Sequence, residues 1–212
     1  MPTTDLMNAL KISAVTFQPQ WRQEFTRQAG GNPRVADIGP EVWTAVITAG
    51  IMNNDDAVDA AAIVNQLRGS LNTFYVWDVR RQYPRLDPTG SILGASSVVI
   101  HAMADASHIQ LGGLPVGYVL KRGDKFCFDF GSPAHRAFHE LCADATADGS
   151  GILPSTEVVP SIRTGATNGL AVTLKQPAAE MMIQPGSYKF DTPGQGGGVT
   201  TAQITLTAIQ VP

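Results

Sequence analysis

The sequence predicts a mainly β protein, either a β-sandwich or a split β-barrel, with one amphipathic α-helix packed on it. Short segments rich in β-branched and aromatic residues recur along the chain, as is typical of strands. Residues that favour turns, chiefly glycine, proline, aspartate and serine, separate these segments. One segment alone has the clear 3.6-residue hydrophobic period of a helix.

The helix is predicted over residues 54–68. Asn53 and Asn54 can cap its start, and Gly69 provides a natural stop. Aspartates in the first turns are favourable because they lie near the positive end of the helix dipole; they are Asp55, Asp56 and Asp59. An apolar stripe at helical spacing predicts the buried face; it consists of Ala60, Ile63, Val64 and Leu67.

Strands are predicted on both sides of the helix. In the segment DKFCFDF (124–130), phenylalanines alternate with Lys125, Cys127 and Asp129, which predicts one buried face. The segment that follows the helix, 71–78, is aromatic and also alternates. The remaining predicted strands are 11–17, 42–48, 97–103, 108–111, 137–143, 157–162, 171–175, 179–184 and 199–211.

We expect residues 1–212 to form a single domain with three long loops or arms. Two of these, 18–40 and 79–96, are rich in proline and glycine, and the third, 191–198, contains a glycine run. Long connections without secondary structure are uncommon in compact domains unless they serve a function.

The composition points to an oligomer. Charged residues make up 16% of the chain, against about 25% in an average soluble domain, and interface cores are depleted in charge in the same way. A net charge of −3 without a Lys/Arg cluster argues against nucleic-acid binding. We expect no membrane contact, because no apolar stretch approaches the length of a span, and no signal peptide precedes the first strand.

No catalytic residue, metal site or cofactor is predicted. His135 and His139 have the spacing of zinc ligands on a helix, but a strand would hold them about 13 Å apart. Cys127 and Cys142 would lie near the same rung if 124–130 pairs with 137–143. We interpret them as buried reduced thiols, because two cysteines do not make a disulfide scaffold, and no nucleophile signature accompanies them. The run GQGGG (194–198) lacks the lysine of a phosphate-binding loop.

The loop 79–96 carries the candidate subunit-interface residues Arg80, Arg81, Tyr83 and Arg85. Arginine and tyrosine are enriched at the energetic centres of protein interfaces. A nucleic-acid contact and a simple solvated loop stay open as alternatives.

The order of several segments resembles one protein family. The strand VWTAVIT (42–48) precedes the Asp/Ala-rich helix, which exits through Leu67-Arg68-Gly69, and an aromatic strand then ends in Asp78. The segments that follow are RRQYPRLDPTGS (80–91), GLPVGYVLKRGD (113–124), FHEL (138–141), DATADGSG (144–151), VPSIR (159–163) and VTLKQPA (172–178). Over residues 41–212, this order resembles the distal tail proteins and related tail-tip ring proteins of long-tailed phages, prophages and gene transfer agents.

The resemblance implies a split β-barrel or two-sheet sandwich with one helix, and a structural role in the virion. Such proteins form a ring, usually of six copies, that joins the end of the tail tube to the hub and tip proteins of the baseplate. The expected partners are therefore further copies of the chain in a homo-hexamer, a tail tube protein and tail hub or tip proteins. The expected location is the tail tip of a virion assembled in the host cytoplasm. The family carries no catalytic residues, so none is transferred to this chain.

Three alternatives stay open. A tail tube or tail hub subunit would share the small β-barrel pattern. A carbohydrate-binding module would need exposed coplanar aromatic rings, for which Trp21, Trp77 and Tyr83 are the candidates, with Trp77 expected to be partly buried. An enzyme with an unfamiliar site would need convergent polar residues in a closed pocket.

Overall fold

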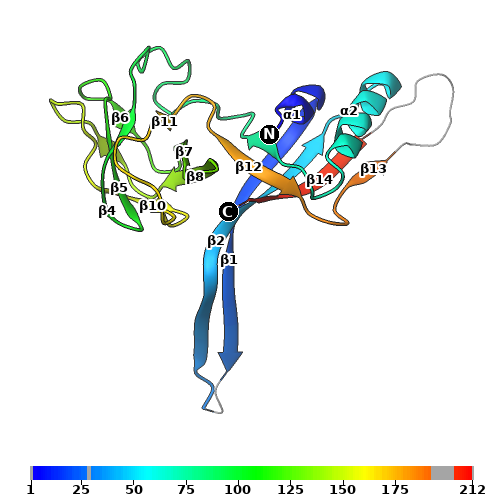
Figure 1. The fold of residues 1–212 in the computed structure, drawn as a ribbon, viewed down its shortest axis with the longest axis horizontal. Helices are drawn as coiled ribbons and strands as arrows, with labels where there is room; N and C mark the ends of the chain where they lie inside the picture. Colours follow the sequence, from blue (N-terminus) through cyan, green and yellow to red (C-terminus); the bar gives the residue numbers. More distant parts are fainter. Residues whose placement is uncertain (1, 28–29, 192–202, 212) are drawn as a thin grey trace.

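The computed structural model of the chain describes residues 2–27, 30–191 and 203–211. It is a mainly β protein with a small helical part, which confirms the predicted fold class. Figure 1 shows two lobes side by side, with a long hairpin projecting from their junction. The helices are α1 (Asp5–Ala9) and α2 (Asn54–Gln66). The strands are β1 (Ile12–Arg27), β2 (Pro33–Ala49), β3 (Phe74–Trp77), β4 (Val99–Asp105), β5 (His108–Gly112), β6 (Val119–Leu120), β7 (Lys125–Phe130), β8 (His135–Leu141), β9 (Ala145–Thr146), β10 (Thr156–Val159), β11 (Val172–Thr173), β12 (Ala178–Ile183), β13 (Lys189–Asp191) and β14 (Gln203–Gln210).

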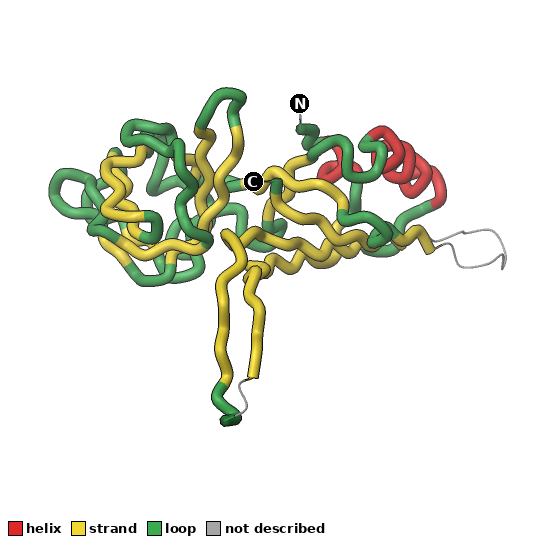
Figure 2. Tube along the Cα trace, turned by 60° about the horizontal axis from the view of Figure 1, so that its bottom comes forward, coloured by secondary structure: helices red, strands yellow, loops and turns green. Residues whose placement is uncertain are grey.

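The first lobe is a helix-covered antiparallel sheet. Its strand order is β1-β2-β14-β12-β3, and β13 pairs with β14. Both helices lie on one side of this sheet (Figure 2). Alternate residues of β2, such as Trp43, Ala45 and Ile47, are buried together with Ala60 and Val64 of α2. The sheet therefore buries one face beneath the helices, as a half-exposed antiparallel sheet does.

The helix α2 matches the predicted helix, and it ends two residues earlier than expected. The side chain of Asn53 accepts a hydrogen bond from the backbone N–H of Asp56 at 2.8 Å, as an N-cap does. Arg68 and Gly69 have positive φ angles of 52° and 69°, so the chain leaves helical geometry before residue 68. The short helix α1 was not predicted, because five residues are too few to display a helical period.

Residues 18–27 and 33–40 lie in the two strands of a β-hairpin, so the prediction of a loop here was wrong, while the arm itself is present. The turn passes through Gly31, which has φ +81°. The prolines that suggested a loop occupy positions that strands tolerate. Pro19 lies on the edge strand β1, Pro33 is the first residue of β2, and Pro40 lies at a shift in the strand register.

The second lobe is a nearly closed barrel-like sheet with the order β11-β7-β8-β10-β5-β4. An isolated bridge between Val99 and Ala171 brings its two edges together. The alternating phenylalanines of β7 (Phe126, Phe128 and Phe130) are buried in its core, as predicted. In the chain, this lobe lies between β3 and β12, which pair with each other in the first lobe.

The two lobes share the strands β7 and β8 as a common wall. Cys127 and Phe138, on these strands, belong to the core of the first lobe. The indole N–H of Trp43 donates to the carbonyl oxygen of Phe138 at 2.8 Å, and the ring centroid of Phe17 lies 5.4 Å from that of Phe138. This aromatic cluster fixes the root of the arm against the barrel.

Of the other two predicted loops, one is described in full. Residues 79–96 form turns without a helix or strand, as expected. The predicted loop 191–198 begins at Asp191, the last residue of β13, and residues 192–198 lie outside the described part of the chain.

Candidate assembly site

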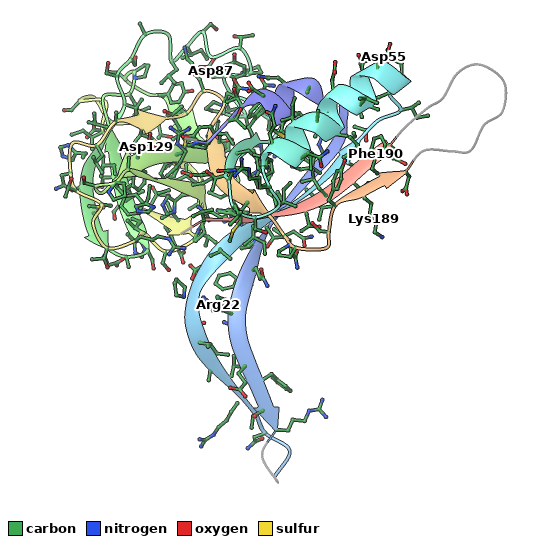
Figure 3. All side chains as sticks on the ribbon, turned by 45° about the vertical axis from the view of Figure 1, so that its right-hand side comes forward. Arg22, Asp55, Asp87, Asp129, Lys189 and Phe190 are labelled. Carbon is green, nitrogen blue, oxygen red and sulfur yellow. The ribbon has the colours of Figure 1, made fainter. Side chains whose placement is uncertain are left out.

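The arm is the part of the molecule that its own chain covers least. The strand β14 pairs with β2 only from Thr44 to Thr48. Beyond Glu41, β1 and β2 continue as an isolated two-stranded ribbon, in which Arg27 pairs with Pro33 near the tip. Figure 3 shows the arm, with Arg22 labelled, standing clear of both lobes. An isolated two-stranded ribbon is marginally stable in water.

One face of the arm, which we call its apolar face, carries exposed hydrophobic side chains with the polar pair Gln23 and Asp37 among them, and the other face is mostly polar. Side chains alternate along a strand, so Trp21 and Phe25 lie on the same face of β1, and Val35 lies directly opposite Phe25. The guanidinium of Arg27 lies over the Phe25 ring, 5.9 Å from its centroid. The other face carries Arg22, Glu24 and Thr26 from β1, with Ala36 and Arg34 opposite Glu24 and Thr26.

The apolar face of the arm continues the core-facing side of the sheet. Val15 and Phe17 have the same alternation as Trp21 and Phe25, because the register shifts between Gln20 and Gln23 insert their extra residues into β2. Val15 is buried and Phe17 packs against the core. Farther out, the exposed fractions rise to 52% for Trp21, 58% for Phe25, 60% for Val35 and 62% for Ile38. The core-facing side of the sheet thus extends into solvent, where no described residue covers these side chains.

A buried carboxylate anchors the root of the arm. Glu41 accepts hydrogen bonds from the backbone N–H and the hydroxyl of Ser161, at 2.6 and 2.9 Å. Burial alone would raise the pKa of Glu41, but these hydrogen bonds and the nearby Arg163 outweigh it and lower the pKa. A groove of about 500 Å³ lies beside this anchor, lined by Pro40, Phe130, His135, Ser161, Ile162, Arg163 and Thr164. The arm is therefore held at a fixed angle to the barrel.

The four predicted interface residues lie together in the loop 79–96. Arg80, Arg81, Tyr83 and Arg85 line a groove of about 440 Å³, which we call the arginine groove, with Val79, Gln82, Pro84 and Pro88. Arg85 is partly engaged within the chain, because its guanidinium donates to the carbonyl oxygen of Arg122 at 3.0 Å. Their role as interface residues stays a prediction.

Two buried aspartates hold this loop in place. Asp87 accepts hydrogen bonds from the backbone N–H groups of Ile92 and Leu93, at 3.1 and 2.9 Å, and from the hydroxyl of Tyr118 at 3.2 Å. Burial alone would raise the pKa of Asp87, but these bonds outweigh it and lower the pKa. Asp124 accepts from the backbone N–H of Arg85 at 3.0 Å. The arginines are therefore presented by an ordered loop.

Gly90 shows how closely the loop is packed. Its φ is +67°, and a Cβ atom built there would lie 2.9 Å from the ring of Tyr83. Only glycine combines that backbone conformation with this contact. Tyr83 is thus held against the backbone of its own loop, with 36% of its surface exposed.

The histidine and cysteine side chains singled out in the sequence do not come together in one site. The described residues contain no group of three or more His, Cys, Asp and Glu side chains placed to hold a metal ion. His135 is exposed, whereas His139 is buried, and the Nδ1 of His139 donates to the carbonyl oxygen of Pro160 at 2.8 Å. The expectation that Cys127 and Cys142 share a rung was wrong, because Cys127 pairs with Phe138 and Cys142 follows the end of β8. Both thiols are free.

The three aromatic residues of the carbohydrate alternative lie on different features. Trp77 is buried at 7% exposure, somewhat more than expected. Trp21 belongs to the arm and Tyr83 to the loop 79–96. Figure 3 shows Asp87, within that loop, on the opposite side of the body from Arg22 on the arm. These side chains do not form a common platform.

The sequence contains a hairpin signal for the arm beside the prolines and glycines that indicate a loop. Gly30-Gly31 between two runs with β-branched and aromatic residues is a hairpin signal, and Trp21 and Phe25 share a face only if the segment is a strand. The missed candidate residues are therefore Phe25 and Val35, whereas Trp21 was named only for the carbohydrate alternative.

Comparison with known proteins adds no relative. A scan against protein-family models finds no match, and a search of curated proteins finds none either. In the described part of the chain, neither helix has the length and apolar character needed to cross a membrane. The interpretation of this surface rests on its own geometry.

Proposed function

We propose that the chain is a structural subunit of a phage-like tail. Copies of it form a ring, of six subunits, at the distal end of the tail tube and connect the tube to the hub and tip proteins. The proposal assigns the chain no chemical reaction. The segment order from residue 41 onward, which resembles tail-tip ring proteins, supports this particular role.

The single observation that carries the proposal is the uncovered apolar face of the arm. Trp21, Phe25 and Val35 continue a core face beyond the body. Large hydrophobic side chains that gather on one exposed face mark an interaction site. A two-stranded ribbon of this kind gains stability when another surface covers that face.

The shape of the molecule supports a closed ring of identical subunits. In the proposed ring the arm covers a surface of the neighbour other than its arm, and heterologous contacts of this kind generate rings when the rotation closes. The low charge content of 16% fits a chain whose flanks are covered in the assembly.

The experiment measures the mass and shape of the purified full chain. Native mass spectrometry distinguishes a hexamer of about 135 kDa from a hub-like trimer of about 68 kDa, for a chain of 22.5 kDa. Negative-stain electron microscopy shows whether the particles have a central opening. We expect closed hexameric rings.

Two results would count against the proposal. A chain that stays monomeric at about 100 μM, roughly a hundredfold above the affinity of a micromolar contact, would overturn the assembly role. A closed trimer would support the alternative of a tail hub subunit.

A further inference from the structure

We infer that the arginine groove of one copy receives the outward face of helix α2 of the next copy. This inference rests on the proposed ring, and it names a contact between subunits that the arm does not make. The groove supplies positive charge and an aromatic ring, and the helix supplies two carboxylates and small apolar side chains.

The arginine groove contains one guanidinium, that of Arg80, that no described residue neutralises, whereas Arg81 and Arg85 interact with the carboxylate of Asp124. Among the described residues, the guanidinium of Arg80 has no hydrogen bond or ion pair; only its backbone N–H is used, donating to the carboxylate of Asp78 at 3.0 Å. Arg80 and Arg81 are adjacent and both exposed. Leu86, 51% exposed, lies in the same loop. An acidic partner with apolar side chains would match this surface.

The outward face of α2 has the complementary composition. Asp55, Val58, Asp59 and Ala62 are all exposed. Their spacing of three and four residues places them in one row along the helix. Helices that dock in grooves present their contacts at this spacing.

The two acidic residues of this row also lack a cationic partner among the residues that the structure describes. Asp56 binds the ammonium of Lys11, whereas no described residue forms a salt bridge with Asp55 or Asp59. Asp55 and Asp59 are four residues apart, a spacing at which like charges destabilise a helix. Arginines from a neighbour would relieve this repulsion and the repulsion between Arg80 and Arg81.

The positions of the two surfaces suit a head-to-tail contact. Figure 3 shows Asp55 at the outer end of α2, and Asp87, which anchors the groove loop, on the other lobe. One copy therefore cannot make this contact with itself. Two different surfaces at opposite ends of a subunit are what a closed ring requires.

A second copy fits the groove better than a nucleic acid does. Nucleic-acid binding needs a broad basic surface, and the chain as a whole carries a net charge of −3. The groove loop itself is bordered by the carboxylates of Asp78 and Asp124. A short acidic helix face can pair with the arginines through its two carboxylates. A nucleic-acid strand would bring further phosphates close to Asp78 and Asp124, which repel them.

The test is a charge exchange in the full-length chain. Arg80→Glu and Asp59→Lys are made singly and together, and assembly is followed by analytical ultracentrifugation over a range of concentrations. Each single variant is expected to raise the concentration for half-assembly about tenfold, because an attraction becomes a repulsion. The double variant restores the opposite charges and is expected to return to within about threefold of the wild type.

Controls separate this contact from folding and from charge in general. Lys189→Glu changes the charge of β13, outside both surfaces, and is expected to assemble like the wild type. Thermal unfolding of each variant checks that it is folded. Arg80→Gln and Asp59→Asn provide milder changes if a reversed charge prevents folding, and each is expected to weaken assembly about threefold.

The outcomes distinguish this inference from the proposed function. Wild-type chain that never assembles overturns both. Wild-type rings together with single variants that assemble normally overturn the inference and leave the ring standing. The inference is also overturned if the single variants fail to assemble and the double variant does not restore assembly. It is overturned as well if the wild type binds a single-stranded oligonucleotide and Arg80→Glu loses that binding while it assembles normally.

Discussion

Replacing the exposed aromatic residues of the arm tests whether its apolar face is an assembly contact. The variants Trp21→Thr and Phe25→Thr remove the rings and place a β-branched residue, which favours strands, at each position. Both side chains are more than half exposed in the isolated chain. The free energy of unfolding of the monomer should therefore change by less than about 0.5 kcal/mol.

The expected loss in assembly follows from the exposed area. An aromatic side chain of this kind contributes roughly 150–250 Å², so a half-exposed ring leaves roughly 100 Å² to be covered by a neighbour. At about 25 cal/mol per Å², each ring contributes roughly 2.5 kcal/mol to a contact that covers it fully. Each single variant should then weaken subunit association about 50-fold.

Sedimentation of the wild type and the variants across a concentration series measures this loss. Glu24→Gln lies on the polar face of the same arm and serves as the matched control, with expected assembly close to that of the wild type. The reasoning is refuted if the aromatic variants assemble at wild-type concentrations. It is also refuted if Glu24→Gln weakens assembly as strongly as Phe25→Thr does.

Three further predictions concern the stability of the single chain. Burial lowers the pKa of His139 to about 4 in the folded chain. Between pH 6.5 and pH 4 this imidazole is therefore protonated in the unfolded chain and neutral in the folded chain. The free energy of unfolding should consequently fall by roughly 3 kcal/mol from pH 7 to pH 4. His139→Phe should remove this part of the pH dependence in chemical denaturation; an unchanged slope would contradict it. Asp87→Ala leaves three donors without their acceptor and should lower stability by about 3 kcal/mol, with faster proteolysis within residues 79–96; a loop as resistant as that of the wild type would show that other contacts hold it. Trp43→Ala should cost about 3–5 kcal/mol in thermal unfolding, and a loss below 1 kcal/mol would mean that the lobes do not depend on this ring.

The elements that the sequence predicted well are those with a local signal. The helix α2 has its cap at Asn53 and a buried stripe at helical spacing, and both can be seen within fifteen residues. The strand β7 has three alternating phenylalanines. Such patterns depend on which side of an element is buried, and that information is local.

The arm was assigned to a loop because its signals conflict. Its prolines and glycines are typical of loops, yet Pro19 and Pro33 occupy tolerated positions at a strand edge and a strand start. The apolar alternation of Trp21 and Phe25 extends beyond the body, where no core of this chain explains it. When a partner covers the apolar face of a strand, the core of a single chain does not explain the alternation of that strand.

The contacts between the lobes were also beyond reach from the sequence. Cys127 lies on the side of β7 that was expected to be exposed, and it is buried because β7 separates two cores. Likewise, the Arg/Tyr loop was recognised from its composition, but its anchoring by Asp124 joins residues 39 positions apart. Long-range pairings of this kind depend on topology and leave no local period.

The most direct test of a self-completing arm is photocrosslinking from position 25. Phe25 is replaced by p-benzoylphenylalanine, and ¹⁴N-labelled and ¹⁵N-labelled chains are mixed, assembled, irradiated and digested. Mass spectrometry then identifies which copy each crosslinked peptide came from. We expect crosslinks between light and heavy chains, directed to one surface of the neighbouring subunit. Crosslinks confined to single chains, or none above the level of a dilute monomer, would contradict the account.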